Sequence, residues 1–167
     1  MDAIEAIKSR RSCREFLPDA VDKAVIKDII DCARFAPTGW GKQPWEFVVV
    51  TDKAMRERIA EIAYYGRFIA QAPVCVAVYC RPTTFYLEDG CAATQNILLA
   101  ATAHGLGSCW VGGDKQEFAD KLHAPLGVEE DLKLICLIAI GHPAKPAGKA
   151  EKRPLAEVLH WEQFGRH

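Results

Sequence analysis

Hydrophobic and polar positions alternate along the chain with two different periods, one typical of helices and one typical of buried strands. Apolar residues at positions i, i+3 and i+4 mark amphipathic helices, whereas β-branched runs such as FVVV and VCVAVYC mark strands. Together these patterns predict helices over residues 2–10, 22–36, 53–63, 86–104 and 115–123, strands over 47–50, 74–80 and 132–141, and a short strand or extended loop over 108–112. Strands interleaved with helices, with an apolar tail outside that alternation, predict an α+β fold whose tail packs on a partner.

The expected helix over residues 86–104 differs from the others in composition. Small residues lie on more than one of its faces, so other helices can approach it closely from several sides. It overlaps a stretch from Gly90 to Gly113 that contains no Asp, Glu, Lys or Arg and is long enough for a membrane span. Polar residues such as Gln95 and Asn96 make that stretch unfavourable in a lipid bilayer. We therefore expect the central helix of a domain or of a subunit interface, and no membrane segment.

Composition is typical of a single domain over residues 1–167, with 50% hydrophobic and 26% charged residues. Lysine and arginine (21) nearly balance aspartate and glutamate (22), and the net charge of -1 argues against nucleic acid as a partner. The seven cysteines form no C-x-x-C pair and lie in apolar segments, which predicts reduced, buried thiols and a cytoplasmic location. The N-terminus has no apolar h-region, so no secretory signal is expected.

Three arginines and a serine cluster in RRSCR, residues 10–14. Guanidinium groups donate paired hydrogen bonds to phosphate, and a hydroxyl can add another, so Arg10, Arg11, Ser12 and Arg14 are candidates for binding a phosphomonoester. The alternative is a solvated basic turn that compensates the C-terminal dipole of the preceding helix.

Two glycine-containing segments can offer backbone amides to a ligand. In APTGWGKQPWEFVVV (36–50), a loop precedes a strand and can approach a flat ligand closely, while Trp40 and Trp45 are expected to pack. In GLGSCWVGG (105–113), a helix C-cap explains Gly105 but leaves Gly112–Gly113 unexplained. The spacing of these glycines is not that of a dinucleotide fingerprint.

The remaining polar clusters give weaker evidence for a functional site. Lys149, Lys152 and Arg153 form a second basic group that can reach the same anion or belong to a solvated linker. Glu88–Asp89 complements the positive end of the long helix, which we favour over a role in acid-base catalysis. The histidines lack metal-ligand spacing, and neither a G-x-S-x-G elbow nor a P-loop occurs, so we expect no metal site and no hydrolase.

Taken in order, these segments make the chain resemble the FMN-dependent nitroreductase family. The resemblance covers nearly the whole length and is carried by RRSCR, APTGWGKQPWEFVVV, EDGCAATQNILLAATAHGLGSCWVGG, IGHP and KRPLAEVLHWEQF. It implies an α+β sandwich with a central, mainly antiparallel sheet flanked by helices. It also implies an intertwined homodimer whose C-terminal arm, residues 153–167, packs on the partner subunit, with two FMN molecules in clefts between the subunits.

The resemblance also implies roles for individual residues. Arg14 would reach the N1–C2=O edge of the flavin, and Gly112 would present its amide near N5; these two are the candidate catalytic residues. The implied cofactor-binding residues are Arg10, Arg11, Ser12 and Arg14 from one subunit, Pro37, Thr38, Gly39 and Gly41 near the flavin of the other, Val111, Gly112 and Gly113 with amides that meet N5 and O4, and Lys152 and Arg153 as candidates for the phosphate.

The chemistry implied by the family suits these residue types. Reduction places negative charge near N1 of the ring, where a fixed cation such as Arg14 stabilises it. A glycine amide near N5 orients the atom that accepts and returns hydride without blocking the ring face. In the implied ping-pong mechanism, NADH or NADPH gives hydride to FMN and leaves, and a small electron-poor acceptor such as a nitroaromatic or a quinone takes its place.

The chain departs from the family pattern in two ways. Gly41 stands where many relatives have Asn, which removes one polar contact, and no long insertion is present that could form a lid. The aromatic residues Tyr64, Tyr65, Phe68, Phe85 and Tyr86 are candidates for the cleft, although core packing is expected for most of them. Alternatives with the same fold are dehalogenation, azoline oxidation and flavin fragmentation, and a flavin-binding or anion-binding module without turnover is a further one.

Overall fold

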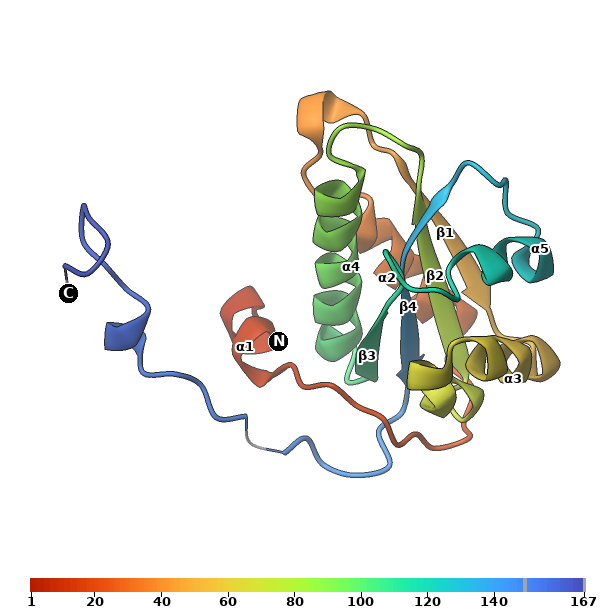
Figure 1. Ribbon diagram of the computed structural model, residues 1–167. Coiled ribbons are helices and arrows are strands. Elements are labelled where there is room, and N and C mark those ends of the chain that lie inside the picture. Colours follow the sequence, from red (N-terminus) through yellow and green to blue (C-terminus); the bar gives the residue numbers. More distant parts are fainter. Residues whose placement is uncertain (149, 167) are drawn as a thin grey trace.

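A computed structural model describes residues 1–148 and 150–166 and contains one antiparallel sheet with helices on both of its faces (Figure 1). The strands are β1 (Trp45–Val50), β2 (Val74–Cys80), β3 (Gly107–Gly112) and β4 (Lys133–Gly141), in the order β1-β2-β4-β3. The α-helices are α1 (Ala3–Ser9), α2 (Lys23–Ala33), α3 (Lys53–Ile62), α4 (Tyr86–Ala103) and α5 (His123–Leu126). Short 3-10 helices are η1 (Gly39–Gly41), η2 (Tyr64–Ala70), η3 (Asp120–Leu122) and η4 (Leu155–Glu157). The predicted α+β fold with a central antiparallel sheet is confirmed.

The core has two parts, one on each face of the sheet. Alternate residues of β2 point to opposite faces, so Val76 and Val78 pack with α2 and α4, whereas Ala77 and Tyr79 pack with α3 and η2. All seven residues of β2 are buried, which agrees with the continuous apolar run VCVAVYC. The sheet therefore forms the middle layer of a sandwich.

Helix α4 is the central helix that its composition predicts. It contacts α1, α2 and all four strands. At Gly90 a Cβ would lie 2.5 Å from Cγ1 of Ile135 and 3.0 Å from Sγ of Cys80, so only glycine lets the helix approach the sheet this closely. Ile135 lies next to a β-bulge, where the register between β2 and β4 shifts at Val78/Tyr79.

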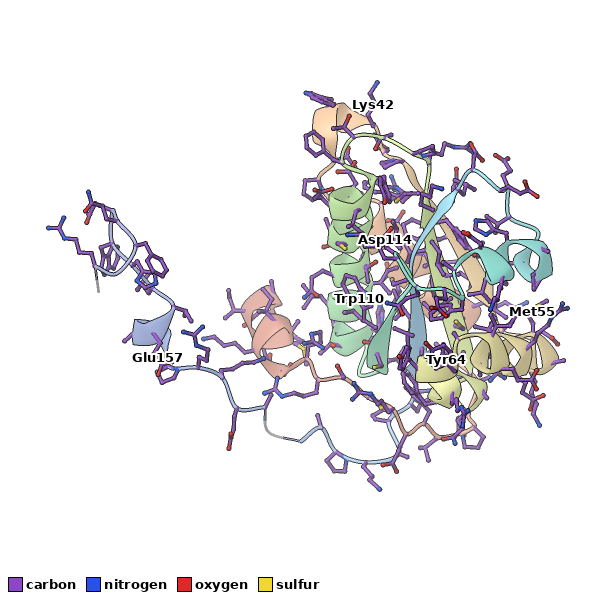
Figure 2. All side chains as sticks on the ribbon, viewed as in Figure 1. Lys42, Met55, Tyr64, Trp110, Asp114 and Glu157 are labelled. Carbon is purple, nitrogen blue, oxygen red and sulfur yellow. The ribbon has the colours of Figure 1, made fainter. Side chains whose placement is uncertain are left out.

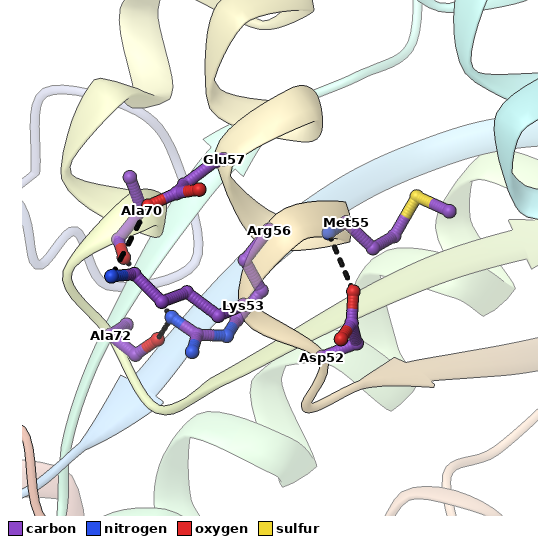
Figure 3. Close-up of polar contacts among 7 residues, drawn as sticks. All are labelled: Asp52, Lys53, Met55, Arg56, Glu57, Ala70 and Ala72. Carbon is purple, nitrogen blue, oxygen red and sulfur yellow. Dashed lines mark hydrogen bonds and ion pairs between the residues drawn. The ribbon is translucent and has the colours of Figure 1, made fainter.

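The predicted helix over residues 115–123 is wrong. Turns occupy most of this segment, and only η3 and the short α5 follow. Lys115 adopts a left-handed conformation (φ 61°) that a regular helix does not contain, and Gly127 (φ 64°) ends α5 after one turn. Helix α3, by contrast, begins as predicted, with the Asp52 side chain accepting a 2.8 Å hydrogen bond from the backbone N–H of Met55 (Figure 3).

The two terminal segments differ in how they meet the sandwich. Residues 10–16 run along its edge, and the C-terminal tail extends away from the body with η4 on it (Figure 1). Large apolar side chains of the tail, such as Trp161 and Phe164, are exposed. Among the described helices, none has the length and apolarity needed to cross a membrane.

Candidate functional site

The segment that contains RRSCR runs beside the edge strand β3. Ser12 forms a parallel bridge with Ser108, and the backbone N–H of Cys13 donates to the Ser108 carbonyl over 2.8 Å. This pairing extends the sheet beyond β3 and leads the chain to Arg14. The guanidinium carbon of Arg14 lies 5.9 Å from the centre of the Phe68 ring, within the range of a cation–π interaction. Arg14 therefore lies where the edge of the sheet meets η2.

Arg14, β3 and η2 line a cavity of about 370 Å³. Its lining residues are Arg14, Tyr65, Phe68, Cys109, Trp110, Val111, Gly112 and Gln116. Tyr65 packs on Tyr64 with ring centres 4.1 Å apart, and Tyr64 meets the ring of Phe118 edge-on at 6.3 Å. Figure 2 shows Tyr64 on η2 near the lower end of β3 and Trp110 on that strand. One wall of the cavity is thus aromatic and braced from behind.

The end of β3 leaves room for a flat ligand at one glycine. A Cβ on Gly112 would have no atom within 4 Å, whereas one on Gly113 would lie 2.6 Å from Cγ of Leu134. The N–H of Gly113 donates to the Ile135 carbonyl over 3.0 Å. Of the two glycines that the sequence leaves unexplained, Gly112 borders open space, and Gly113 is required by packing against β4.

The cavity lies in a positive electrostatic environment. Burial raises the pKa of the Cys109 thiol, whereas Arg14, a hydrogen bond from Ser12 and, more weakly, Arg10 lower it. Arg14 and Arg10 therefore lie near enough to Cys109 to place positive charge on this side of the cavity. An anionic group bound there is stabilised by the same charges.

A second cavity, of about 590 Å³, adjoins the first, and Arg14 lines both. It is formed by residues 9–15, 105–107 and 145–148 with Thr102 and Pro143, and includes Arg10 and Ser12. The Arg11 guanidinium donates to the carbonyls of Lys8, Arg10 and Gly148, so it joins the two chain segments that enclose this cavity. Lys145 pairs with Glu15 at 2.8 Å on the rim.

The loop of Pro37, Thr38, Gly39 and Gly41 lies elsewhere. Gly39 contacts the start of α4, whereas the cavity around Arg10 includes Thr102 near the end of that helix. Helix α4 has 18 residues and is about 27 Å long. Figure 2 shows Lys42 of this loop far from Tyr64. One chain therefore does not bring the loop and the arginines together. Trp45 is buried as predicted, and Trp40, although 75% exposed, packs against the ring of Phe85 with ring centres 5.1 Å apart.

The basic residues of the tail also lie apart from both cavities. Lys152 and Arg153 are exposed, and Arg153 pairs with Glu157 at 3.3 Å one helical turn further on. Lys149, which the sequence groups with them, is outside the described residues. Within the described part of the chain, no group of three His, Cys, Asp or Glu residues has the geometry of a metal site.

Comparison with known proteins agrees with this geometry. The model of the nitroreductase family matches residues 7–66 and 63–142. The chain belongs to the nitroreductase family. A nitroreductase relative from Methanothermobacter thermautotrophicus, named as an NADH dehydrogenase/NAD(P)H nitroreductase, is 34% identical over 89% of this chain and 81% of its own length. A protein of the same name from Archaeoglobus fulgidus is 29% identical over 98% of this chain and 99% of its own length.

Solved nitroreductase structures share the fold throughout. A protein from Bacteroides thetaiotaomicron named as an NADH dehydrogenase/NAD(P)H nitroreductase superposes with a TM-score of 0.92 at 30% identity, covering 97% of this chain and 98% of its own. A nitroreductase from Desulfovibrio desulfuricans, solved in complex with FMN, superposes with a TM-score of 0.86 at 32% identity, covering 98% of both chains. The predicted family is confirmed.

One lining residue of the cavity was not singled out from the sequence. Gln116 lies in the segment wrongly predicted to be a helix, whereas Tyr65 and Phe68, two of the five aromatic candidates for the cleft, form a wall of the cavity. The aromatic pair gives no periodic signal, because η2 follows α3 after a single residue and reads as its continuation. Only the neighbouring glycine, Gly66, marks the close approach of η2 to Val111 of β3.

Proposed function

We propose that this member of the nitroreductase family is an FMN-dependent oxidoreductase that takes reducing equivalents from NADH or NADPH and passes them to a small electron-poor acceptor. The observation that supports this most is that Arg14 lines two adjoining cavities at once. One has an aromatic wall and an open glycine, which suits a flat ring, and the other contains Arg10 and Ser12, which suit a phosphate.

The chain's own residues would hold the cofactor in three ways. Arg10 and Ser12 bind the phosphate, and Arg11 shapes that cavity through its carbonyl contacts. Val111, Gly112 and Gly113 lie along the ring, with Gly112 leaving its face open. FMN, when bound, supplies the acceptance and return of a hydride. Arg14 places a fixed cation where the ring gains negative charge, and Tyr65 and Phe68 limit access of water from the side.

Because the loop of Pro37, Thr38, Gly39 and Gly41 lies at the other end of α4, we propose that it serves the flavin of a second copy of the chain. A homodimer also gives a place to the arm of residues 153–167, whose exposed apolar side chains would pack on the partner. In such a dimer, Lys152 and Arg153 would be free to approach a phosphate bound to the partner, since within one chain they line neither cavity. The donor and the acceptor would use the same cleft in turn, as in a ping-pong mechanism.

The experiment that tests the proposal is an anaerobic visible spectrum of the purified protein, before and after addition of NADH and then NADPH. We expect FMN absorbance that bleaches with at least one donor and returns when a nitroaromatic or a quinone is added. Flavin that neither donor reduces would instead favour a binding module or another flavin chemistry, such as dehalogenation or azoline oxidation. Protein that cannot be loaded with FMN would overturn the proposal.

A further inference from the structure

The loop of residues 37–43 holds a backbone conformation that its own residues do not favour. Trp40 (φ 52°), Gly41 (φ 67°) and Gln43 (φ 48°) all lie in the left-handed region. Residues with a Cβ rarely adopt this region, and two of these three have one. Such a conformation persists where surrounding structure fixes it.

Contacts from the start of α4 fix the loop. The backbone N–H of Gly39 donates to Oδ1 of Asp89 over 2.9 Å. Phe85 packs so closely that a Cβ on Gly39 would lie 2.5 Å from its Cδ2, and the ring of Trp40 lies 5.1 Å from that of Phe85. The aromatic contacts press the loop against the helix, and the hydrogen bond sets its orientation.

Asp89 is an unusual residue for the place that it occupies. It is only 4% exposed, and its Oδ2 is buried without a hydrogen-bond partner among the described residues. A buried carboxylate with one unsatisfied oxygen is costly for the fold. The positive end of the helix dipole partly offsets that cost. The neighbouring Glu88 already complements the dipole from an exposed position, so the dipole does not require a buried acidic residue. The start of the helix alone therefore does not explain Asp89, whereas the bond to Gly39 does.

We propose that Asp89 is a positioning residue for cofactor binding. It acts through Gly39 and holds Pro37 and Thr38 in the place from which the loop meets the flavin of the partner subunit. A hydrogen bond to a single backbone amide suits this task, because it fixes one end of the loop and leaves Pro37 exposed. The inference rests on the proposed function and on the sharing of the flavin site between two copies.

The test compares three variants in two measurements, the dissociation constant of FMN and the amide hydrogen exchange of residues 37–43 in the apoprotein. Asp89→Ala removes the acceptor, and we expect FMN to bind about tenfold more weakly and the loop to exchange about tenfold faster. Asp89→Asn keeps an oxygen for the Gly39 amide and should stay within about twofold of wild type in both. Glu88→Gln removes the same charge from the same turn and should also stay within about twofold.

Each outcome bears on a separate claim. Wild-type protein that binds no FMN overturns the proposed function and this inference with it. Wild type that binds FMN while Asp89→Ala binds it equally well overturns the inference alone, even if the loop exchanges faster. Equal weakening in Asp89→Asn or Glu88→Gln overturns it too, because charge rather than the hydrogen bond would then be responsible. If Asp89→Ala does not fold, Asp89→Leu replaces it, since leucine has the same branching at Cγ, leaves no cavity and accepts no hydrogen bond.

Discussion

Arg14 is the single residue whose contacts bear most directly on the proposed chemistry. It contacts the Phe68 ring, lines both cavities and partly offsets the rise that burial causes in the pKa of Cys109. We expect Arg14→Ala to slow reduction of bound FMN by NADH or NADPH about 100-fold, because the cation that stabilises the reduced ring is lost. The dissociation constant of FMN should rise by less than about tenfold, because Arg10 and Ser12 remain to bind the phosphate. Stopped-flow reduction and fluorescence titration measure the two effects.

The exposed Arg58 of α3 provides the control for this experiment. Arg58→Ala removes the same charge from the chain but not from the site, so reduction should keep its wild-type rate. If Arg14→Ala is reduced as fast as wild type, Arg14 has no part in hydride transfer.

The cysteines differ in reactivity because they differ in burial. Burial raises the pKa of Cys75 and of Cys80 to about 12, and raises that of Cys136 as well. A thiol with a pKa of about 12 is ionised at pH 8 in only about one molecule in 10,000. We therefore expect iodoacetamide at pH 8 to leave these three unmodified in the native protein. Mass spectrometry should find Cys13, which is partly exposed, alkylated first. In urea all seven should react, and native labelling of Cys75 would contradict the burial of β2.

At the scale of elements, η2 depends on a buried arginine of α3. Arg56 donates from Nη1 to the carbonyl of Ala70 over 3.0 Å and to that of Ala72, and so holds the end of η2 against α3 (Figure 3). We expect Arg56→Met to lower the free energy of unfolding by about 2 kcal/mol, because two carbonyls lose a charged donor. Urea denaturation and hydrogen exchange over residues 64–72 measure this change.

The same residue links stability to the site, because η2 carries Tyr65 and Phe68. Arg56→Met should therefore raise the KM for an aromatic acceptor more than it lowers kcat. Arg58→Met, on the exposed side of the same helix, is the matched control and should change neither stability nor KM. An unchanged exchange rate over η2 would show that Arg56 does not hold it.

Elements with a strong local signal could be predicted from the sequence, and those set by distant contacts could not. The apolar runs predicted β2 and β4, and the helical spacing of apolar residues predicted α3 from residue 53 onward. Local chemistry likewise pointed to RRSCR and to Gly112 and Gly113 at the end of β3. Segment η2 and the turns around Lys115 were missed, because packing against Val111 and β4 decides their conformation rather than their own composition. The bond from Asp89 to Gly39 joins residues 50 positions apart and has no local signal.

At the scale of the whole molecule, the arm of residues 153–167 leaves large apolar side chains exposed in a single chain. Leu155, Trp161 and Phe164 are exposed, and so are Ile4 and Ile7 on α1. Burying two aromatic side chains contributes about 1.5–3 kcal/mol each. We expect a chain that ends at Arg153 to dimerise at least 100-fold more weakly, on the order expected from two such anchors.

Analytical ultracentrifugation over a range of concentrations measures this, with Gln163→Ala in the full-length chain as a control that leaves the apolar anchors in place. A shortened chain that stays dimeric at nanomolar concentration would place the interface on the helices alone. Loss of FMN together with dimerisation would indicate that the cofactor needs both subunits.

The length of α4 also has a consequence for inheritance, because two defective copies can restore one another. If each flavin site takes Arg14 from one chain and the loop held by Asp89 from the other, the two substitutions Arg14→Ala and Asp89→Ala damage different halves of a site. In a mixed dimer both defects fall in one site, and the second site is intact. When the two variants are unfolded, mixed and refolded together, random pairing should recover about a quarter of wild-type activity, although neither variant shows this alone. Two alleles that damage different halves of the site would then complement each other within one cell.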